Sequence, residues 1–513
     1  MKFYPYIIGA AMALSMGFTS CVGDLDVDPE DPNSTTSLGN AEQYYGLLAR
    51  AYGGLVLEGG ISVDDGGAGV YTRQLWNLQE LPTDEAIVGY NWKDAGIQEL
   101  GFCTWSSDNH WLYECFSRFT YQIALCNEFL RSKGEAEKYI DAAEVETLCA
   151  EARTLRALSY YHMIDLFGRG PWSTEKLGVG ATPPTYDRKQ LFDATVAELE
   201  EVIPMLVPAS QQIYGRISRE AGKMLLAKLY LNAEVYTGEG KWQECADLCN
   251  DIRSTIPSLA PEYKYLFCAT NDKYVGNGEI LWAIPQDNTS LYTYGGTSYL
   301  AVGAYNGEVD VTQFGISSDG WGGPRVRPEL SQALAAGDKR RLIYEGEMSE
   351  SLTDLNSWKA DGSGYMCIKY VYTPETNYDN ADGSATQDIP YNSADYPLFR
   401  LADTFLMLAE CEKHGATGCN GLDRLNDVRQ RAGLDPVGTY TLDDLLKERQ
   451  CELYWEGHRR SDLIRFGKFS GSSYIWEWKG GLPSGAPTES TRDLMAIPSQ
   501  YVPTIGQNPG YVG

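Results

Sequence analysis

Apolar residues recur at helical spacing in pairs of neighbouring segments, and this pairing limits the folds that the chain can adopt. The segment 221–236 carries Ala, Leu and Tyr side chains at steps of three and four residues, and 242–256 carries a similar stripe of Trp, Cys, Ala and Ile. Such spacing places the apolar side chains on one face of a helix. A short turn with Gly238 joins the two segments. A single helical hairpin cannot bury these faces, so we expect several hairpins to stack.

The hairpin 221–256 resembles a tetratricopeptide unit, because a helix–turn–helix of about 34 residues has the length of that repeat. The alternative is an isolated helical hairpin. Similar signals occur elsewhere: 135–167 carries a leucine stripe that stops at Gly168, and 401–412 with 422–432 forms a second predicted hairpin. Thr441 and Asp444 form a predicted capping box, which would begin one more helix. The sequence therefore predicts a mostly α-helical, tetratricopeptide-like scaffold.

Two long regions do not follow the helical pattern. They are rich in Gly, Tyr, Asn and Asp, and contain short β-like runs at 280–284 and 365–372. Long loops inside a compact domain are usually functional. We expect one domain at 41–513, with a loop-like tail from 471. Its helical scaffold should span about 41–52, 111–256 and 397–470, and its loop-rich, ligand-binding part about 53–110 and 257–396.

The N-terminus is predicted to be a lipoprotein signal. The apolar run 7–18 is too short for a transmembrane helix, which needs about 20 residues, but fits the core of a secretory signal peptide. A buried N-terminal helix is the alternative. The residues before Cys21 resemble a bacterial lipobox, which predicts removal of residues 1–20, lipid on Cys21, and an acidic tether at 21–40. The tether's alternating acids suggest a calcium loop, but Pro29 and Thr35 stand where an EF-hand needs Gly and Glu.

The composition excludes some functions and favours others. A formal net charge of −28 argues against nucleic acid as a partner. With four His and no CxxC among 12 Cys, we expect neither a metal site nor a cofactor, and most cysteines should be small buried apolar residues. The chain has 35 Tyr and 12 Trp but only 14 Phe. Rings with one polar end suit surfaces that bind ligands or partners.

Several segments, in order along the chain, are similar to those of the SusD/RagB family of outer-membrane nutrient-binding lipoproteins. These segments are 151–160, 167–171, 400–410, 425–433, 448–453, 456–465, 496–498 and 507–511. The resemblance implies a tetratricopeptide-like scaffold that carries a variable loop-rich part. It also implies a non-enzymatic protein that binds a glycan, or in some cases a peptide, at the cell surface. Members sit as a lid on a TonB-dependent β-barrel importer, so this chain should deliver an oligosaccharide to such a partner in the outer membrane.

Two aromatic windows are the candidate ligand site, at 71–94 and 292–325. Sugars offer flat C–H faces that contact Trp and Tyr rings, and hydroxyls that need polar partners. By the family resemblance, the glycan-binding residues are Arg73, Trp92, Tyr294 and Trp321. Tyr292 and Tyr299 are alternatives to Tyr294, and core packing is the alternative for each Trp. Glycines flank Trp321, which should leave its ring exposed.

Other functional classes stay open at this point. The same architecture could bind a peptide or another nutrient, or act as a tetratricopeptide-like scaffold for proteins. A glycosidase would need two carboxylates across a cleft. Glu448, Glu452 and Glu456 lie on one helix face, and we interpret them as an ion-pair network with nearby arginines. The expected partners are Arg449, Arg459, Arg460 and Arg465.

Overall fold

The computed structural model describes most of the predicted domain. The described residues are 38–58, 67–89, 92–178, 180–305, 310–316, 320–352, 355, 363–378 and 391–511. The predicted signal peptide, Cys21 and most of the tether lie outside them. Among the described residues, no helix has both the length and the apolar character needed to cross a bilayer.

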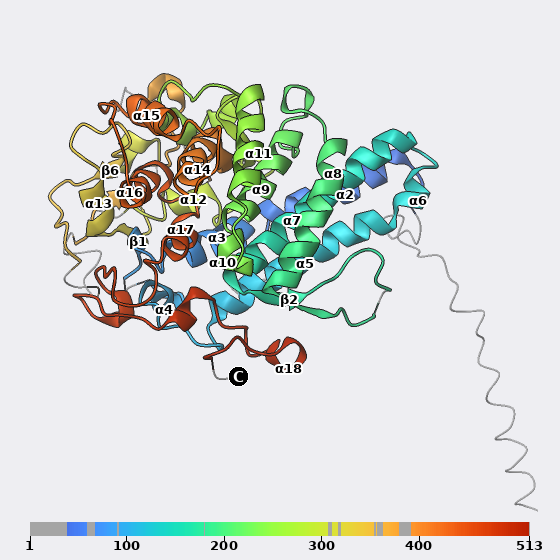
Figure 1. Ribbon diagram of the computed structural model, residues 1–513, viewed down its shortest axis with the longest axis horizontal. Coiled ribbons are helices and arrows are strands. Elements are labelled where there is room, and N and C mark those ends of the chain that lie inside the picture. Colours follow the sequence, from blue (N-terminus) through green and yellow to red (C-terminus); the bar gives the residue numbers. More distant parts are fainter. Residues whose placement is uncertain are drawn as a thin grey trace, which may run out of the picture.

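Long helices lie side by side and form the scaffold (Figure 1). Contacts run from α2 to α5, α7, α8, α9, α11 and α14 in turn, and α14 then contacts both α15 and α16. The bounds are α2 (Ala41–Val56), α5 (His110–Arg131), α7 (Ala142–Leu166), α8 (Arg188–Val202), α9 (Arg219–Leu231), α11 (Trp242–Thr255), α14 (Leu401–Lys413), α15 (Gly421–Arg431), α16 (Leu442–Leu453) and α17 (Arg459–Arg465). The predicted stack of helical hairpins is confirmed.

Local sequence signals begin and end these helices. The side chain of Thr441 accepts from the Asp444 amide, and Asp444 accepts in return from the Thr441 amide, which confirms the predicted capping box of α16. Gly238, at φ +83°, ends the helical segment before α11 in a conformation that favours glycine. The helix predicted at 221–236 is divided at Asn232 into α9 and α10 (Ala233–Thr237). At this point the side-chain amide nitrogen of Asn232 donates to the Lys228 carbonyl at 3.0 Å.

The remaining elements are short and join distant parts of the chain. Four two-stranded antiparallel sheets are described: β1 (Ala86–Ile87) with β5 (Arg325–Val326), β2 (Arg169–Pro171) with β3 (Thr185–Asp187), β4 (Ile280–Ile284) with β8 (Tyr396–Arg400), and β6 (Ile343–Tyr344) with β7 (Met366–Cys367). The run at 280–284 is thus a strand as predicted, whereas 365–372 forms only β7. The short helices are α4 (Ile97–Gly101), α6 (Lys133–Ala136), α12 (Thr297–Leu300), α13 (Pro328–Ala333) and α18 (Val502–Ile505).

A helix occupies part of the region that the sequence suggested was loop-rich. All ten residues of α3 (Tyr71–Glu80) are buried, including its polar ones. The polar side chains find partners far along the chain: the amide nitrogen of Gln79, for example, donates to Asp165 at 2.7 Å. The part expected to be loop-rich at about 53–110 thus contains a buried helix, which the sequence did not indicate because polar residues interrupt its apolar stripe.

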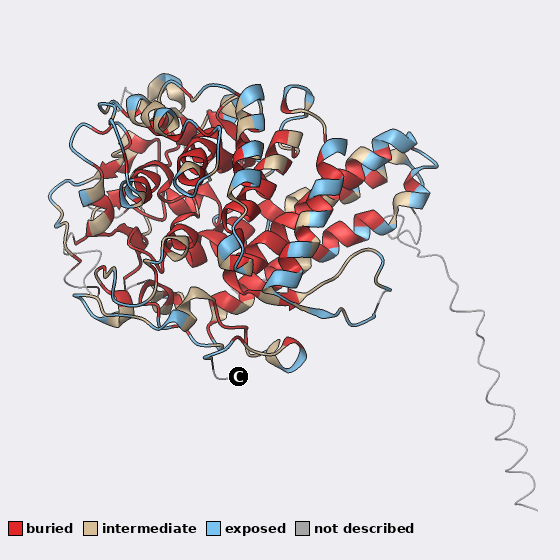
Figure 2. Cartoon of the chain, in the orientation of Figure 1, coloured by how far each residue is buried: buried red, intermediate tan, exposed pale blue. Residues whose placement is uncertain are grey.

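The core extends through the helical scaffold and into the loop-rich part. Figure 2 shows buried residues on the inner faces of the helices and exposed residues on their outer faces. The 11 cysteines that the structure describes are all free and buried, which confirms their interpretation as small core residues.

The three glutamates on and after α16 form ion pairs, but not with the arginines expected. Glu448 pairs with Arg340 and Arg429, Glu452 with Arg340, Arg400 and Arg431, and Glu456 with Arg400 and Lys369. The expected partners bind other acids: Arg449 contacts Asp403 and Asp462, Arg459 contacts Asp84, Arg465 contacts Glu410 and Asp462, and Arg460 lies nearest Asp165. Residues adjacent in a helix point about 100° apart, so sequence neighbours of the glutamates face other elements.

Candidate functional site

The fold brings the two aromatic windows together. Strands β1 and β5 are antiparallel, with Ile87 opposite Arg325. The segment that follows β1 and contains Trp92 therefore starts at the same end of this sheet as the segment that precedes β5 and contains Trp321. A Cβ atom at Gly323 would lie 2.9 Å from Cζ3 of Trp92. The glycine therefore permits close approach of the Trp92 ring to the second window.

Arg73 is positioned behind this surface and not on it. Its side chain is only 4% exposed, and its guanidinium lies 4.4 Å from the ring centroid of Tyr299 and 5.1 Å from that of Trp111. It donates from Nη2 to Oδ2 of Asp94, and the same oxygen accepts from Nε1 of Trp92 at 2.8 Å. The Asp94 side chain is 36% exposed. Asp94 is therefore the polar group that this cluster presents, and Arg73 orients it together with Trp92.

The second window forms a row of four rings. Trp321 lies 5.6 Å from Tyr294 between ring centroids, Tyr294 lies 4.8 Å from Tyr391, and Tyr391 lies 4.5 Å from Tyr292. Tyr292 is 45% exposed and Tyr294 is 37% exposed, while Trp321 and Tyr391 are half-buried. We call these four residues the aromatic row. It presents ring faces and phenolic hydroxyls on one surface, which suits a ligand with both flat apolar faces and hydroxyls.

Burial distinguishes the candidate tyrosines. Tyr299 is fully buried and its hydroxyl donates to Asn77 at 3.1 Å, so it belongs to the core. Tyr292 and Tyr294 are both exposed members of the aromatic row. Burial, and then the contact with Tyr294, raises the pKa of Tyr391 to about 12. Its hydroxyl is consequently neutral and can donate a hydrogen bond at physiological pH.

Asp94 and Tyr391 are site residues that were not among the four selected from the sequence, although Asp94 ends the first aromatic window. Asp94 follows Trp92 by two positions, and an acid so close to a candidate Trp was a usable signal. Tyr391 comes from a third segment, shortly before β8, and reaches Tyr292 and Tyr294 only through the fold. Nothing in its local sequence indicated that contact.

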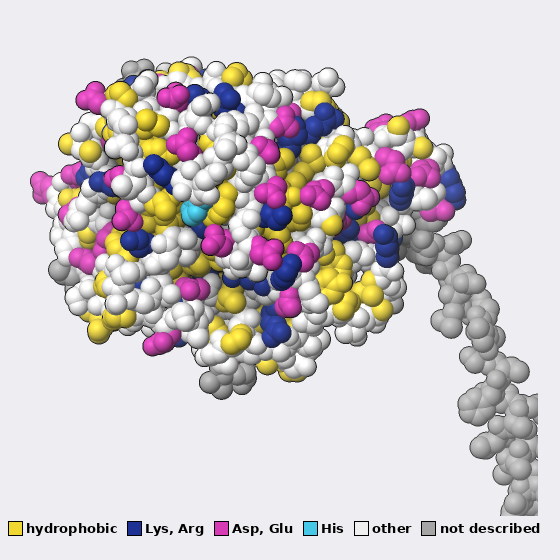
Figure 3. All heavy atoms as spheres, in the orientation of Figure 1, with side chains coloured by type: hydrophobic (Ala, Val, Ile, Leu, Met, Phe, Trp, Pro, Cys, Tyr) yellow, Lys and Arg dark blue, Asp and Glu magenta, His cyan; other side chains and the backbone are white. Residues whose placement is uncertain are grey.

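The described residues offer no group of His, Cys, Asp and Glu that could hold a metal ion. On the face drawn in Figure 3, acidic and basic side chains are interspersed without a continuous basic area. The exposed tyrosines of the aromatic row and the partly exposed Asp94 suit binding through ring faces and neutral or acidic polar groups.

Comparison with known proteins identifies the family. The model of the SusD family matches residues 337–495. The chain is 30% identical to the starch-binding protein SusD of Bacteroides thetaiotaomicron, over 99% of each chain. The chain belongs to the SusD family. This finding confirms the family resemblance that was inferred from the sequence segments.

Solved structures of SusD-like proteins share the fold. A laminarin-binding SusD-like protein matches with a TM-score of 0.71 and 23% identity, over 92% of this chain and 100% of the other. The surface glycan-binding protein A from Bacteroides thetaiotaomicron, in complex with laminarihexaose, matches with a TM-score of 0.70 and 20% identity over the same shares. The SusD-like, mostly helical architecture predicted from the sequence is confirmed.

Proposed function

We propose that this SusD-family protein binds an oligosaccharide at the cell surface. The aromatic row is the observation that carries the proposal, because four rings from distant segments form one partly exposed surface beside an acidic side chain. Trp321 and Trp92 would contact sugar ring faces, while Asp94 and the tyrosine hydroxyls would bind sugar hydroxyls. Relatives named for starch binding and for a laminarihexaose complex support the same class of ligand.

Arg73 has an indirect part in this proposal. Its guanidinium is enclosed by the rings of Tyr299 and Trp111, and it holds Asp94 in place. The family resemblance made Arg73 a direct ligand of the glycan. The buried position supports a positioning role, in which Arg73 keeps the Asp94 side chain directed towards the ligand.

We also propose lipid anchoring and transfer to an importer. Cys21 would carry the lipid, the tether would place the domain outside the outer membrane, and a TonB-dependent β-barrel would receive the glycan. The rigid helical scaffold is the expected docking surface, with an interface above about 1,000 Å². Extraction in mild detergent should co-purify a large β-barrel with the protein. Recovery of the monomer alone, where other lipoprotein–barrel pairs survive, would contradict this part.

The proposed role is binding without catalysis. The three glutamates that first suggested a glycosidase are buried in ion pairs with side chains of Arg and Lys. A glycosidase needs two carboxylates on either side of the scissile bond. A reducing-sugar assay on starch and laminarin should therefore show no release.

Calorimetry with maltoheptaose and laminarihexaose tests the proposal. A shallow site should give a Kd between about tens of micromolar and millimolar. Trp321→Ala should weaken binding by about 1–3 kcal/mol, because it removes one stacking ring. Trp242→Ala is the matched control, since Trp242 is not part of the aromatic row. Its ring stacks on that of His414, with 3.8 Å between the ring centroids. Equal affinity in Trp321→Ala and wild type would exclude Trp321 as the platform, and binding of peptides alone would favour a peptide nutrient.

A further inference from the structure

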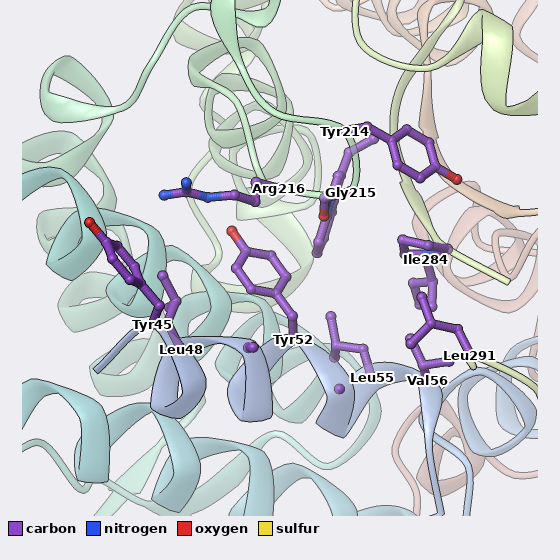
Figure 4. Close-up of a pocket in the computed structure, with 14 residues that line it drawn as sticks. Tyr45, Leu48, Tyr52, Leu55, Val56, Tyr214, Gly215, Arg216, Ile284 and Leu291 are labelled. Carbon is purple, nitrogen blue, oxygen red and sulfur yellow. Dashed lines mark hydrogen bonds between the residues drawn. The ribbon is translucent and has the colours of Figure 1, made fainter. Parts of the chain in front are cut away.

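An apolar pocket lies beside the aromatic row. It has a volume of about 340 Å³ and is formed by α2, the segment 214–216 and the segment 282–291. Figure 4 shows side chains from these three parts of the chain around one space. Its lining includes Leu48, Leu55, Val56, Ile284 and Leu291. The size is at the lower end of the range typical for small-molecule sites.

The polar side chains in the lining are already engaged. Tyr45, Tyr52, Tyr214 and Arg216 bind carboxylates outside the lining, and Trp282 donates to the carbonyl of Gly215, which is part of the lining. The pairs are Tyr45 with Glu144 at 2.7 Å, Tyr52 with Glu151 at 2.6 Å, Tyr214 with Asp395 at 2.5 Å, Arg216 with Glu151 at 2.9 Å, and Trp282 with the Gly215 carbonyl at 3.2 Å. A bare sugar would lose water at its hydroxyls here without gaining partners. The pocket therefore suits an apolar group.

The pocket adjoins the aromatic row along the chain. Leu291 lines the pocket, and the next residue, Tyr292, is the outermost ring of the row. Asp395 also connects the two, since it accepts from Tyr214 in the pocket wall and follows Tyr391 by four positions. Six of the nine large apolar side chains exposed in the described residues belong to or adjoin these two features: Tyr45, Leu57, Ile213, Tyr214, Tyr292 and Tyr294. Exposed apolar residues gathered in this way mark a binding surface.

We infer that the pocket binds an apolar substituent, an acyl or aryl group, on the glycan that occupies the aromatic row. The inference rests on the proposed glycan-binding function and specifies its substrate class: a glycan or glycoside that carries an ester-linked or aromatic group. The row would bind the sugar rings, and the pocket would remove the substituent from water. No polar group of the substituent is required, because the lining is mainly apolar and its polar side chains already make the hydrogen bonds given above.

Two glycine variants on one helix make a matched test. A Cβ atom at Gly53, which lines the pocket, would have its nearest neighbour 3.9 Å away, and one at Gly46 would have no neighbour within 4 Å. Both glycines lie inside α2, where a side chain raises helix propensity. Gly53→Phe should fill the pocket, whereas Gly46→Phe adds the same ring elsewhere. Neither change should reduce the free energy of unfolding.

The experiment compares an oligosaccharide with its aryl glycoside by calorimetry. The first ligand is the oligosaccharide that the wild type binds, either maltoheptaose or laminarihexaose. The second is the 4-nitrophenyl glycoside of that oligosaccharide, and the third is uncharged 4-nitroanisole as the isolated apolar group. Wild type and Gly46→Phe should bind the aryl glycoside about ten- to a hundredfold more tightly than the free oligosaccharide, as burial of one ring implies. Gly53→Phe should lose that gain and keep its affinity for the free oligosaccharide.

Other outcomes would overturn the inference in distinguishable ways. Equal affinity of the wild type for the two glycan forms would show that the pocket does not contribute, while the proposed function would stand. Binding of 4-nitroanisole that Gly53→Phe abolishes, with no glycan bound at all, would remove the proposed function and with it the assignment to a substituted glycan. Loss of a co-purified β-barrel in Gly53→Phe, with unchanged glycoside affinity, would make the pocket a protein-docking surface.

Discussion

Replacement of Glu452 by Gln should destabilise the protein strongly without affecting ligand binding. Glu452 is fully buried and contacts Arg400 at 2.9 Å, Arg431 at 2.5 Å and Arg340 at 3.4 Å. Burial raises its pKa, but the three guanidinium groups outweigh that effect and lower the pKa to about 2. The carboxylate is therefore ionised in the folded protein and holds three cations together. Its removal leaves these cations with one fewer anion in the protein interior.

The magnitude follows from the contacts that change. Three charge-assisted hydrogen bonds become weaker neutral ones or are lost, at about 1 kcal/mol or more each. Removal of one partner from a buried ion pair typically costs about 3–5 kcal/mol, and we expect a loss in that range for the free energy of unfolding. Glu201→Gln is the control, because Glu201 also pairs with an arginine but is 59% exposed. Its loss should stay below about 1 kcal/mol.

Urea unfolding at pH 7, with calorimetry on the glycan, measures both effects. The difference between wild type and Glu452→Gln should be complete above about pH 4.5, the ordinary pKa of a glutamate, and should shrink as the pH falls towards 2. A Glu452→Gln variant as stable as Glu201→Gln would refute the ion-pair reasoning. Loss of a glycan-dependent activity at unchanged stability would instead assign Glu452 a catalytic part.

The remaining predictions concern a second buried acid, the anchor and the polar group of the site. Burial raises the pKa of Asp395 to about 7, so the stability that its neutral form contributes is lost as the pH rises from about 3.8 through 7. Asp395→Asn should therefore be more stable, relative to wild type, at pH 8 than at pH 5. Urea unfolding at the two pH values would measure this difference. Cys21→Ala should release the protein from membranes, and an unmodified Cys21 in the intact mass of membrane-bound material would contradict lipidation. Asp94→Ala should weaken glycan binding at least about fivefold and should lower the free energy of unfolding by about 1–3 kcal/mol, because Arg73 and Trp92 lose a shared acceptor. An unchanged affinity in calorimetry would show that Asp94 is not part of the site.

The helical scaffold was predictable because its signals are local. Stripes of apolar residues, the Thr441 capping box and the glycine at 238 act within a few residues, and the structure has them where the sequence placed them. Helix α3 was not predictable in this way. Its polar residues are buried through partners such as Asp165, which lies 86 positions from Gln79.

The candidate site shows the same limit. Trp92, Tyr294 and Trp321 could be selected from composition and the family resemblance, and the fold brings their segments together. The buried position of Arg73 between Tyr299 and Trp111 depends on contacts between separate elements. Tyr391 and the partners of the α16 glutamates likewise depend on long-range packing, which residue spacing does not encode.

A crystal structure of the protein with its bound oligosaccharide would test the central claim most directly. Our account predicts a sugar ring stacked on the indole of Trp321, at a distance of about 3.5–4.0 Å. It also predicts neighbouring sugar units along Tyr294 and Tyr391, with a hydroxyl bound to Asp94. A glycan that occupies another surface, and leaves the aromatic row in contact with water alone, would contradict the account.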